Sequence, residues 1–198
     1  MRAEHVRAAH ERVVAEVGSR VTIVAATKYV SLEDMALVAE AGIEIVGENR
    51  AQELESKHAA YGDAFRWHFI GHLQSNKARV VDERCDLVHS VDSDSTARRL
   101  SIPMLLEVNL TDEPTKSGVA PSEVAGYVER YPTIRGLMTM PPLAPDPEAS
   151  RRWFRQLRLL AEETALEQLS MGTSQDWRVA VEEGATLIRL GATLFADR

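Results

Sequence analysis

Two basic residues stand where an apolar chain gives little reason for a charge. Lys28 directly follows the β-branched run VTIVAAT (21–27), and Arg189 interrupts the run TLIRLG (186–191). A lysine amine that is desolvated or placed near other cations loses its proton more readily, and the neutral amine attacks aldehydes. A guanidinium inside an apolar strand must find an acceptor, because an unpaired buried charge is very costly. Lys28 is therefore a candidate nucleophile and Arg189 a candidate donor to a ligand.

Each residue also has a purely structural interpretation. Lys28 could extend into solvent from the end of its strand. Arg189 could form an internal salt bridge with Glu107 or with another carboxylate at a strand end. Gly191, two residues after Arg189, would allow a ligand or another backbone to approach closely. The residues alone leave these alternatives open.

A turn of small residues overlaps the end of the run EQLSMG (167–172). It extends from Ser170 to Ser174, and Ser174 and Asp176 precede the helical pattern WRVAVEEG. Such a loop presents backbone N–H groups to an anion. Barrels often bind a phosphate between their last two loops, which here would be this loop and LGAT. The alternative is simple capping of the helix that follows.

Two more motifs, GENRAQE and WHFIGHLQSNK, place polar side chains just past strand ends. Asn49 and His72 are expected on the same rim as Lys28. His68 and His72 have a spacing that on a helix could indicate a metal pair. Here the two histidines flank a strand end and no third ligand is evident, so we predict no metal site.

The elements that must position these residues alternate along the chain. Helical patterns separate short β-branched or apolar runs at 21–27, 43–47, 66–71, 87–91, 103–109, 134–140, 167–172 and 186–191. Alternation of strand and helix predicts parallel strands joined by right-handed crossovers, and eight such units make a closed barrel.

We therefore predict an α/β protein, a single (β/α)8 barrel of the TIM type over residues 1–198, with an extra N-terminal helix at 3–17. An open doubly wound sheet is the alternative, but no G-x-G-x-x-G follows the first run. The segment DSDSTARRLSI between the fourth and fifth runs is about the shortest that can hold a crossover helix. That unit is expected to be clipped or irregular.

Composition limits the functional classes. The chain has 198 residues and a net charge of −7, so it has no generic attraction to nucleic acid or anionic lipid. Its single cysteine, Cys85, fits a reducing compartment. The charged N-terminus lacks the apolar core of a signal peptide, and no apolar run approaches the roughly 20 residues that cross a bilayer. We predict a cytoplasmic protein that binds neither nucleic acid nor membrane and is a monomer.

Six motifs together resemble one known family. ATKY, GENRAQE, WHFIGHLQSNK, LEVNLTDEPTKSG, IRGLMTM and LSMGTSQDWRVAVEEGATLIRLG are similar to the pyridoxal phosphate homeostasis proteins, which are stand-alone relatives of the alanine racemase N-terminal barrel. The resemblance runs from about Val21 to Phe195. It implies a barrel that binds pyridoxal 5′-phosphate (PLP).

The resemblance also implies roles for individual residues. Lys28 would hold the cofactor as a Schiff base, and Arg189 would face the pyridine nitrogen. Ser174 and the backbone after Gly191 would hold the phosphate, and Asn49 would lie beside the ring. The other residues expected at the cofactor are His72, Met171, Ala192 and Thr193.

The chain departs from the family pattern in three places. Thr173 stands where the family usually has Met, and Ala192 stands where it usually has a hydroxyl residue. One side-chain bond to the phosphate is therefore lost or redirected, while the backbone donors remain. The segments before Ser101 and before Glu167 are shorter than usual, which affects helices more than the site.

Bound PLP usually serves amino-acid chemistry by drawing electrons into its ring. An arginine at the ring nitrogen disfavours the protonated ring and so weakens this effect. Related racemases take a second base, a tyrosine, from a β-rich domain, and this chain ends at Arg198 without one; Tyr29 adjoins Lys28 but is expected to point away.

We therefore predict a non-catalytic protein of intracellular vitamin B6 homeostasis that sequesters PLP and delivers it to PLP-dependent apo-enzymes. A PLP-dependent amino-acid racemase is the alternative. A third interpretation is a barrel that binds another phosphorylated metabolite, with Lys28 as an ion-pair partner.

Overall fold

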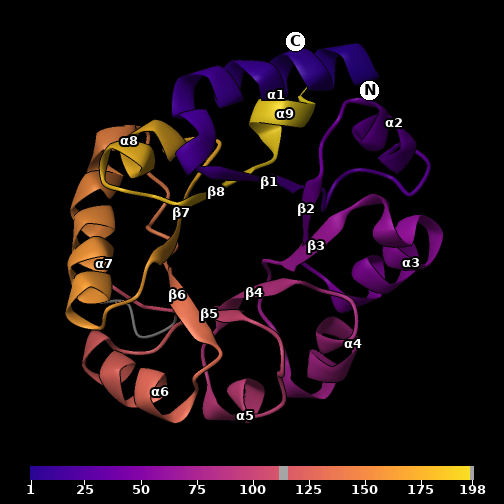
Figure 1. Ribbon diagram of the computed structural model, residues 1–198. Coiled ribbons are helices and arrows are strands. Elements are labelled where there is room, and N and C mark those ends of the chain that lie inside the picture. Colours follow the sequence, from indigo (N-terminus) through magenta and orange to yellow (C-terminus); the bar gives the residue numbers. More distant parts are fainter. Residues whose placement is uncertain (112–115, 197–198) are drawn as a thin grey trace.

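The computed structural model describes residues 1–111 and 116–196; residues 112–115, within the motif LEVNLTDEPTKSG, and 197–198 lie outside this part. Parallel strands form a closed barrel in chain order from β1 to β8 (Figure 1). The strands are β1 (Thr22–Ala26), β2 (Ile45–Glu48), β3 (Arg66–Phe69), β4 (Leu87–Val91), β5 (Met104–Glu107), β6 (Ile134–Met138), β7 (Gln168–Thr173) and β8 (Leu187–Leu190).

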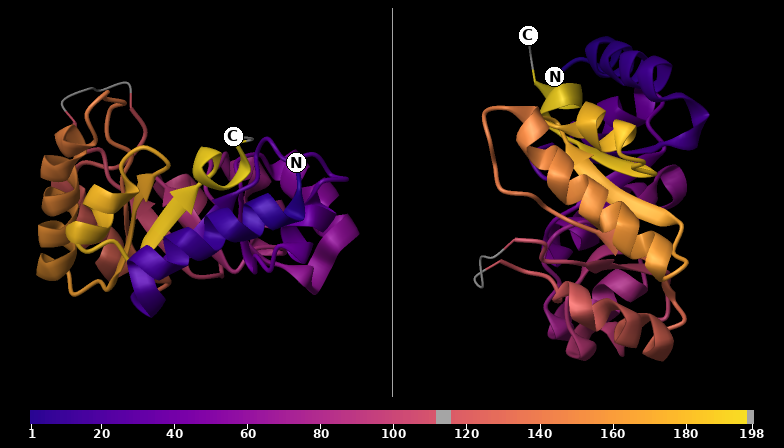
Figure 2. Two further views of the ribbon diagram at one scale, coloured as in Figure 1. Left: turned by 90° about the horizontal axis from the view of Figure 1, so that it is seen from above. Right: turned by 90° about the vertical axis from the view of Figure 1, so that its left-hand side faces the viewer.

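A helix follows each strand on the outside of the barrel. These helices are α2 (Met35–Glu40), α3 (Ala51–Tyr61), α4 (Ala78–Asp82), α5 (Asp94–Ala97), α6 (Val124–Arg130), α7 (Arg151–Glu163), α8 (Trp177–Glu182) and α9 (Ala192–Phe195). One further helix, α1 (Ala3–Val17), precedes β1 and packs against α2 and α9 (Figure 1 and Figure 2). The predicted barrel and its extra N-terminal helix are confirmed.

The strand predictions hold with small shifts at the ends, since each predicted run overlaps one strand, and β2 and β7 each extend one residue beyond their runs. The expected clipped unit is also present, because the chain between β4 and β5 forms only the four-residue helix α5. A closed turn precedes helix α2. Ser31 Oγ accepts a hydrogen bond from the Asp34 N–H at 3.1 Å, which closes a turn before α2 begins at Met35.

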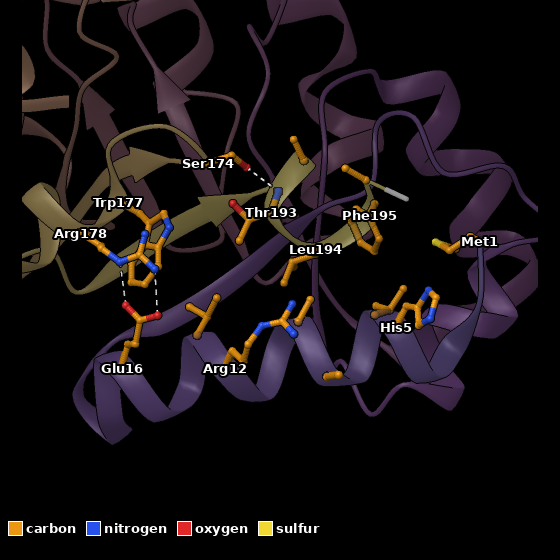
Figure 3. Close-up of a pocket in the computed structure, with 16 residues that line it drawn as sticks. Met1, His5, Arg12, Glu16, Ser174, Trp177, Arg178, Thr193, Leu194 and Phe195 are labelled. Atoms are coloured by element: carbon orange, nitrogen blue, oxygen red, sulfur yellow. Dashed lines mark hydrogen bonds and ion pairs between the residues drawn. The ribbon is translucent and has the colours of Figure 1, made fainter. Parts of the chain in front are cut away.

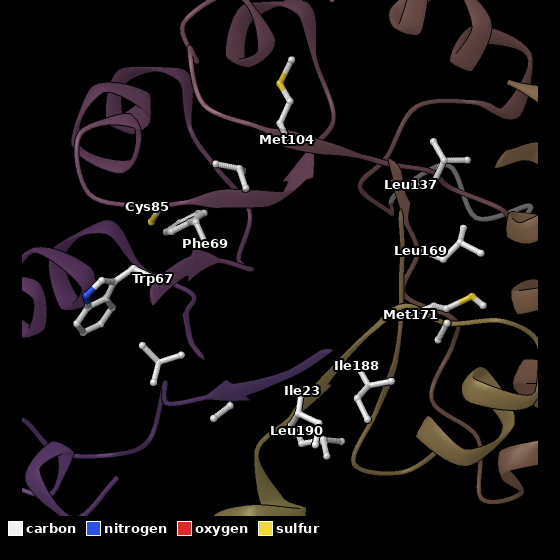
Figure 4. Packing of buried hydrophobic residues seen from close by; sticks show 14 of the residues in the cluster. Ile23, Trp67, Phe69, Cys85, Met104, Leu137, Leu169, Met171, Ile188 and Leu190 are labelled. Carbon is white, nitrogen blue, oxygen red and sulfur yellow. The ribbon is translucent and has the colours of Figure 1, made fainter. Parts of the chain in front are cut away.

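Side chains of the strands alternate between two apolar layers. The outer layer lies between the sheet and the helices, and it includes Ile23, Leu169, Ile188 and Leu190 (Figure 4). The inner layer fills the barrel with Val24, Leu87, Leu105, Met138 and Leu187.

The inner face becomes polar toward the carboxyl ends of the strands. Two residues beyond inner-layer leucines stand His89 on β4, Glu107 on β5 and Arg189 on β8. In barrels this end carries the ligand site. The apolar layer thus forms the floor beneath a buried polar layer.

Across residues 1–111 and 116–196, none of the helices combines the length and the apolar character needed to span a bilayer.

Candidate functional site

Lys28 lies in the turn after β1, two residues beyond Ala26. The Val30 N–H donates to the Thr27 carbonyl at 2.8 Å, which closes this turn. The Lys28 side chain is exposed, and its Nζ lies 4.9 Å from the centroid of the Tyr29 ring. The expectation that Tyr29 points away from Lys28 is therefore wrong, because the turn breaks the alternation of the strand. The amine rests at the rim on a flexible four-carbon stem that can reorient.

A buried ion pair holds the residue before Lys28. Lys57 on α3 donates through Nζ to Glu48 Oε1 at 2.7 Å and to the Thr27 carbonyl at 2.8 Å. Thr27 Oγ1 in turn donates to Glu48 Oε1 at 2.6 Å. All three residues are buried. Sequence reasoning missed this network, because Glu48 and Lys57 belong to different elements and nothing local pairs them.

Arg189 projects into the barrel and is only 5% exposed. Its Nη1 donates to the Ser170 carbonyl at 2.9 Å and to the Ser170 hydroxyl. Its Nη2 donates to the Thr139 carbonyl at 3.2 Å and to Met140 Sδ at 2.9 Å. Burial lowers the pKa of Arg189 to about 10, so the guanidinium stays charged at neutral pH.

The partners of Arg189 decide between its two interpretations. Within the described residues it forms no ion pair with Glu107 or with any other carboxylate, because carbonyl, hydroxyl and thioether groups surround it. A thioether is a weak acceptor. The Met140 contact is thus the one that a stronger acceptor on a ligand would replace most easily.

The other side of the mouth is acidic. Glu107 is 8% exposed, and burial raises the pKa of its carboxyl to about 7, with Asp92 adding to the rise and Arg189 and His72 opposing it. His72 lies on the rim after β3, as expected. Its Nδ1 lies 3.2 Å from Asp92 Oδ2, and its side chain is 60% exposed.

Ser174 joins the loops after β7 and β8. Its Oγ accepts a hydrogen bond from the Gly191 N–H at 3.2 Å. It accepts a second from the Thr193 N–H at 3.1 Å, which Figure 3 shows. It does not cap α8. The residue before that helix, Asp176, instead accepts from the Thr173 N–H at 2.8 Å and so closes its own loop. Two backbone donors that converge on one oxygen form a cradle that an anion oxygen can also occupy.

The remaining predicted residues are divided between the site and the outer layer. Asn49 follows β2, and its Oδ1 is buried with no partner among the described residues. Ala192 begins α9 and is exposed. Met171 is fully buried in the outer layer, on the face opposite Ser170, so its side chain points away from the barrel interior (Figure 4). Any contact of Met171 with a ligand would use its backbone.

The interior also holds polar groups that sequence reasoning did not assign. His89 and Ser170 are fully buried. The Ser170 hydroxyl accepts from Arg189 and lies 2.7 Å from His89 Nδ1. The inward position of His89 follows from its alternation with Leu87 on β4, but a polar residue in a β-branched run gives no hint of its partner. His68 is buried and His72 is exposed. No group of three or more potential metal ligands occurs within residues 1–111 and 116–196.

Two hollows bear on the site: one lies at the barrel mouth and the other on an outer face of the barrel. A hollow of about 350 Å³ opens on the rim beside Glu107, Asn109 and Met140. A groove of about 490 Å³ runs between α1 and the helices α8 and α9 (Figure 3). It contacts the site only through Ser174, Ala192 and Thr193. The groove is therefore the outer side of the cradle rather than the mouth itself.

Sequence comparison relates the chain to curated proteins of one name. The pyridoxal phosphate homeostasis protein of Aquifex aeolicus is 39% identical over 197 residues, which covers 89% of this chain and 86% of that protein. The protein of the same name from Vibrio cholerae is 36% identical over 222 residues, covering 98% and 94%. No family model matches the chain.

Structure comparison gives the same relationship. PipY of Synechococcus elongatus, solved with PLP bound, superposes with a TM-score of 0.89 at 32% identity, covering 96% of this chain and all of that chain. Alanine racemase from Corynebacterium glutamicum has a TM-score of 0.75 at 16% identity, and the match covers 98% of this chain and 62% of the racemase. The racemase shares the barrel fold.

Proposed function

This chain belongs to the pyridoxal phosphate homeostasis protein family, and we propose that it binds pyridoxal 5′-phosphate at the mouth of its barrel. The observation that carries the proposal is the cradle at Ser174, where two backbone N–H groups meet one oxygen. A phosphate oxygen is a stronger acceptor than a hydroxyl, because it is ionised. It would take over these donors and leave Ser174 free to donate to it.

The cradle is close to the proposed anchor. Strand β8 pairs with β1, with Leu190 opposite Ala25. Gly191 consequently lies beside Ala26, two residues before Lys28. A ligand that combines a phosphate and an aldehyde on one small ring would find both partners in neighbouring loops.

The described residues fit such a ligand on the remaining sides. Lys28 is the amine that forms a Schiff base with the aldehyde carbon, and the buried Glu48–Lys57 pair keeps its turn in place. Arg189 offers donors to the ring nitrogen, where Met140 Sδ is now a weak partner. The partnerless Oδ1 of Asn49 supplies an acceptor beside the ring.

We assign the protein a non-catalytic role in which it sequesters PLP and delivers it to apo-enzymes. When bound, the cofactor can draw electrons from an attached amino acid, and this effect is strongest when the ring nitrogen is protonated. Arg189 remains charged at neutral pH even though burial lowers its pKa to about 10. A fixed positive charge at that nitrogen disfavours a second one, so the site is poorly arranged for carbanion chemistry.

An absorbance titration tests the proposal. PLP is added to wild type, to Lys28→Ala and to the control Lys77→Ala, which lies on the surface turn before α4. We expect a new visible band in wild type and in Lys77→Ala, and none in Lys28→Ala. A racemase assay on the loaded wild type should show no turnover. The absence of a band in wild type would refute PLP binding, and turnover that depends on Lys28 would replace the carrier role by catalysis.

A further inference from the structure

A chain of hydrogen bonds crosses the barrel interior from Arg189. The Arg189 guanidinium donates to Ser170 Oγ, which lies 2.7 Å from His89 Nδ1. His89 Nε2 lies 3.0 Å from His68 Nδ1. The four side chains come from β8, β7, β4 and β3, and each is at most 5% exposed. None of them except Arg189 belongs to the site as proposed above.

Arg189 fixes which group donates and which accepts in every hydrogen bond of this chain. A guanidinium has only donors, so Ser170 Oγ must accept from it. Ser170 is fully buried, and among the described residues His89 Nδ1 is the acceptor that its hydroxyl proton can reach. An imidazole nitrogen that accepts is unprotonated, so His89 carries its proton on Nε2 and donates it to His68 Nδ1. His68 must then carry its own proton on Nε2.

Both histidines are neutral in this arrangement. Burial lowers the pKa of His68 to about 4 and that of His89 well below its usual value, and the nearby Arg189 charge lowers the latter further. A neutral pair is required by the geometry as well. A proton on His89 Nδ1 would point at Ser170 and leave the serine hydroxyl proton without an acceptor.

We propose that Ser170, His89 and His68 are positioning residues for Arg189. These hydrogen bonds orient the Ser170 hydroxyl so that it can only accept from Arg189 Nη1. The plane of the guanidinium is fixed as a result. The Nη2 side, where Met140 Sδ is the weakest acceptor, is left for the ligand. This inference rests on the proposed function, because the ligand atom in question is the PLP ring nitrogen.

The donor–acceptor direction of these hydrogen bonds can be tested in the ligand-free protein. Long-range ¹H–¹⁵N correlation spectra distinguish the two imidazole tautomers. At pH 7 wild type should show His89 and His68 neutral with the proton on Nε2, and Ser170→Ala should release His89 from this tautomer. A wild-type His89 with its proton on Nδ1, or with both nitrogens protonated, would overturn the proposal without any use of a variant.

The positioning role is tested by PLP titration of four variants. His89→Phe keeps a ring but removes both bonds, Ser170→Ala breaks the chain at the arginine, and His89→Gln retains one acceptor and one donor. Met138→Leu changes the inner apolar layer and serves as the control. Loss of one charge-assisted bond predicts a dissociation constant raised about tenfold in the first two variants, with a shifted absorbance maximum. His89→Gln should restore both toward wild type.

The outcomes separate this inference from the proposed function. Equal affinities and spectra in His89→Phe, Ser170→Ala and Met138→Leu would refute the positioning role while PLP binding stands. Wild type without any PLP band would refute the proposed function instead. If a variant fails to fold, the tautomers of the wild-type histidines still decide the direction of the chain.

Discussion

The hydroxyl oxygen of Ser174 lies 3.1 Å from the backbone nitrogen of Thr193, although the two residues belong to loops after different strands. The Gly191 N–H donates to the same oxygen at 3.2 Å. A serine that merely capped α8 would turn toward its own helix. The bond across the two loops instead brings two backbone donors together at the carboxyl ends of β7 and β8, where barrels bind phosphates.

Substitution of Ser174 should act on phosphate binding. We expect Ser174→Ala to raise the PLP dissociation constant about tenfold, the cost of one hydrogen bond to a charged group. Thr193→Val should have a smaller effect, because Thr193 contributes its backbone N–H. Titration with pyridoxal, which lacks the phosphate, provides the check. Equal losses for pyridoxal and PLP in Ser174→Ala would contradict a phosphate cradle.

The buried Glu48–Lys57 pair should matter for stability. Lys57→Met leaves the Glu48 carboxylate buried without its partner, and we expect a loss of about 3–5 kcal/mol in the free energy of unfolding. The double variant Glu48→Leu/Lys57→Met should recover part of this loss. The exposed pair of Arg79 and Glu83 is the control, and Arg79→Ala should leave the urea midpoint unchanged. A Lys57→Met variant as stable as wild type would show that the pair is not buried in solution.

Glu107 should make stability depend on pH. Burial raises the pKa of its carboxyl from 4.5 to about 7. Between these values the folded state binds more protons than the unfolded state, so the contribution of Glu107 to stability falls as pH rises from about 4.5 to about 7. Glu107→Gln lacks this titration. It should exceed wild type in stability by up to ~3 kcal/mol at pH 8 and match it near pH 4.5.

Urea unfolding of both proteins at pH 5 and pH 8 measures this difference. His68 and His89, whose pKa values burial lowers, titrate in the opposite sense. They are present in both proteins and cancel in the comparison. A stability difference that is the same at both pH values would contradict a buried, neutral-pH titration of Glu107.

The sequence predicted the barrel because each strand carries its own signal. A β-branched run between polar turns identifies a parallel strand wherever its partner lies, and α1 matches the predicted range. Faces of helices were less certain. In α7, for example, the structure buries Phe154, Leu157 and Ala161 and leaves Trp153 and Leu160 half-buried.

The site was predictable only where a residue is unusual in its own surroundings. Arg189 stood out because a charge in an apolar strand needs an explanation. His89 did not, because its partners His68 and Ser170 are distant in sequence and meet it only in the closed barrel. Lys57 did not, because its partner Glu48 lies on a different element. Tyr29 was misplaced for another reason: it lies in the turn beyond the last residue of β1, where the alternation of a strand no longer applies.

The most direct test of the account is to reduce the PLP-loaded wild-type protein with borohydride, digest it and map the modified lysine by mass spectrometry. The chain offers Lys28, Lys57, Lys77 and Lys116. We predict that the pyridoxyl group is fixed on Lys28 and that Lys28→Ala retains none. Fixation on another lysine, or no fixation in wild type, would contradict Lys28 as the anchor of the cofactor.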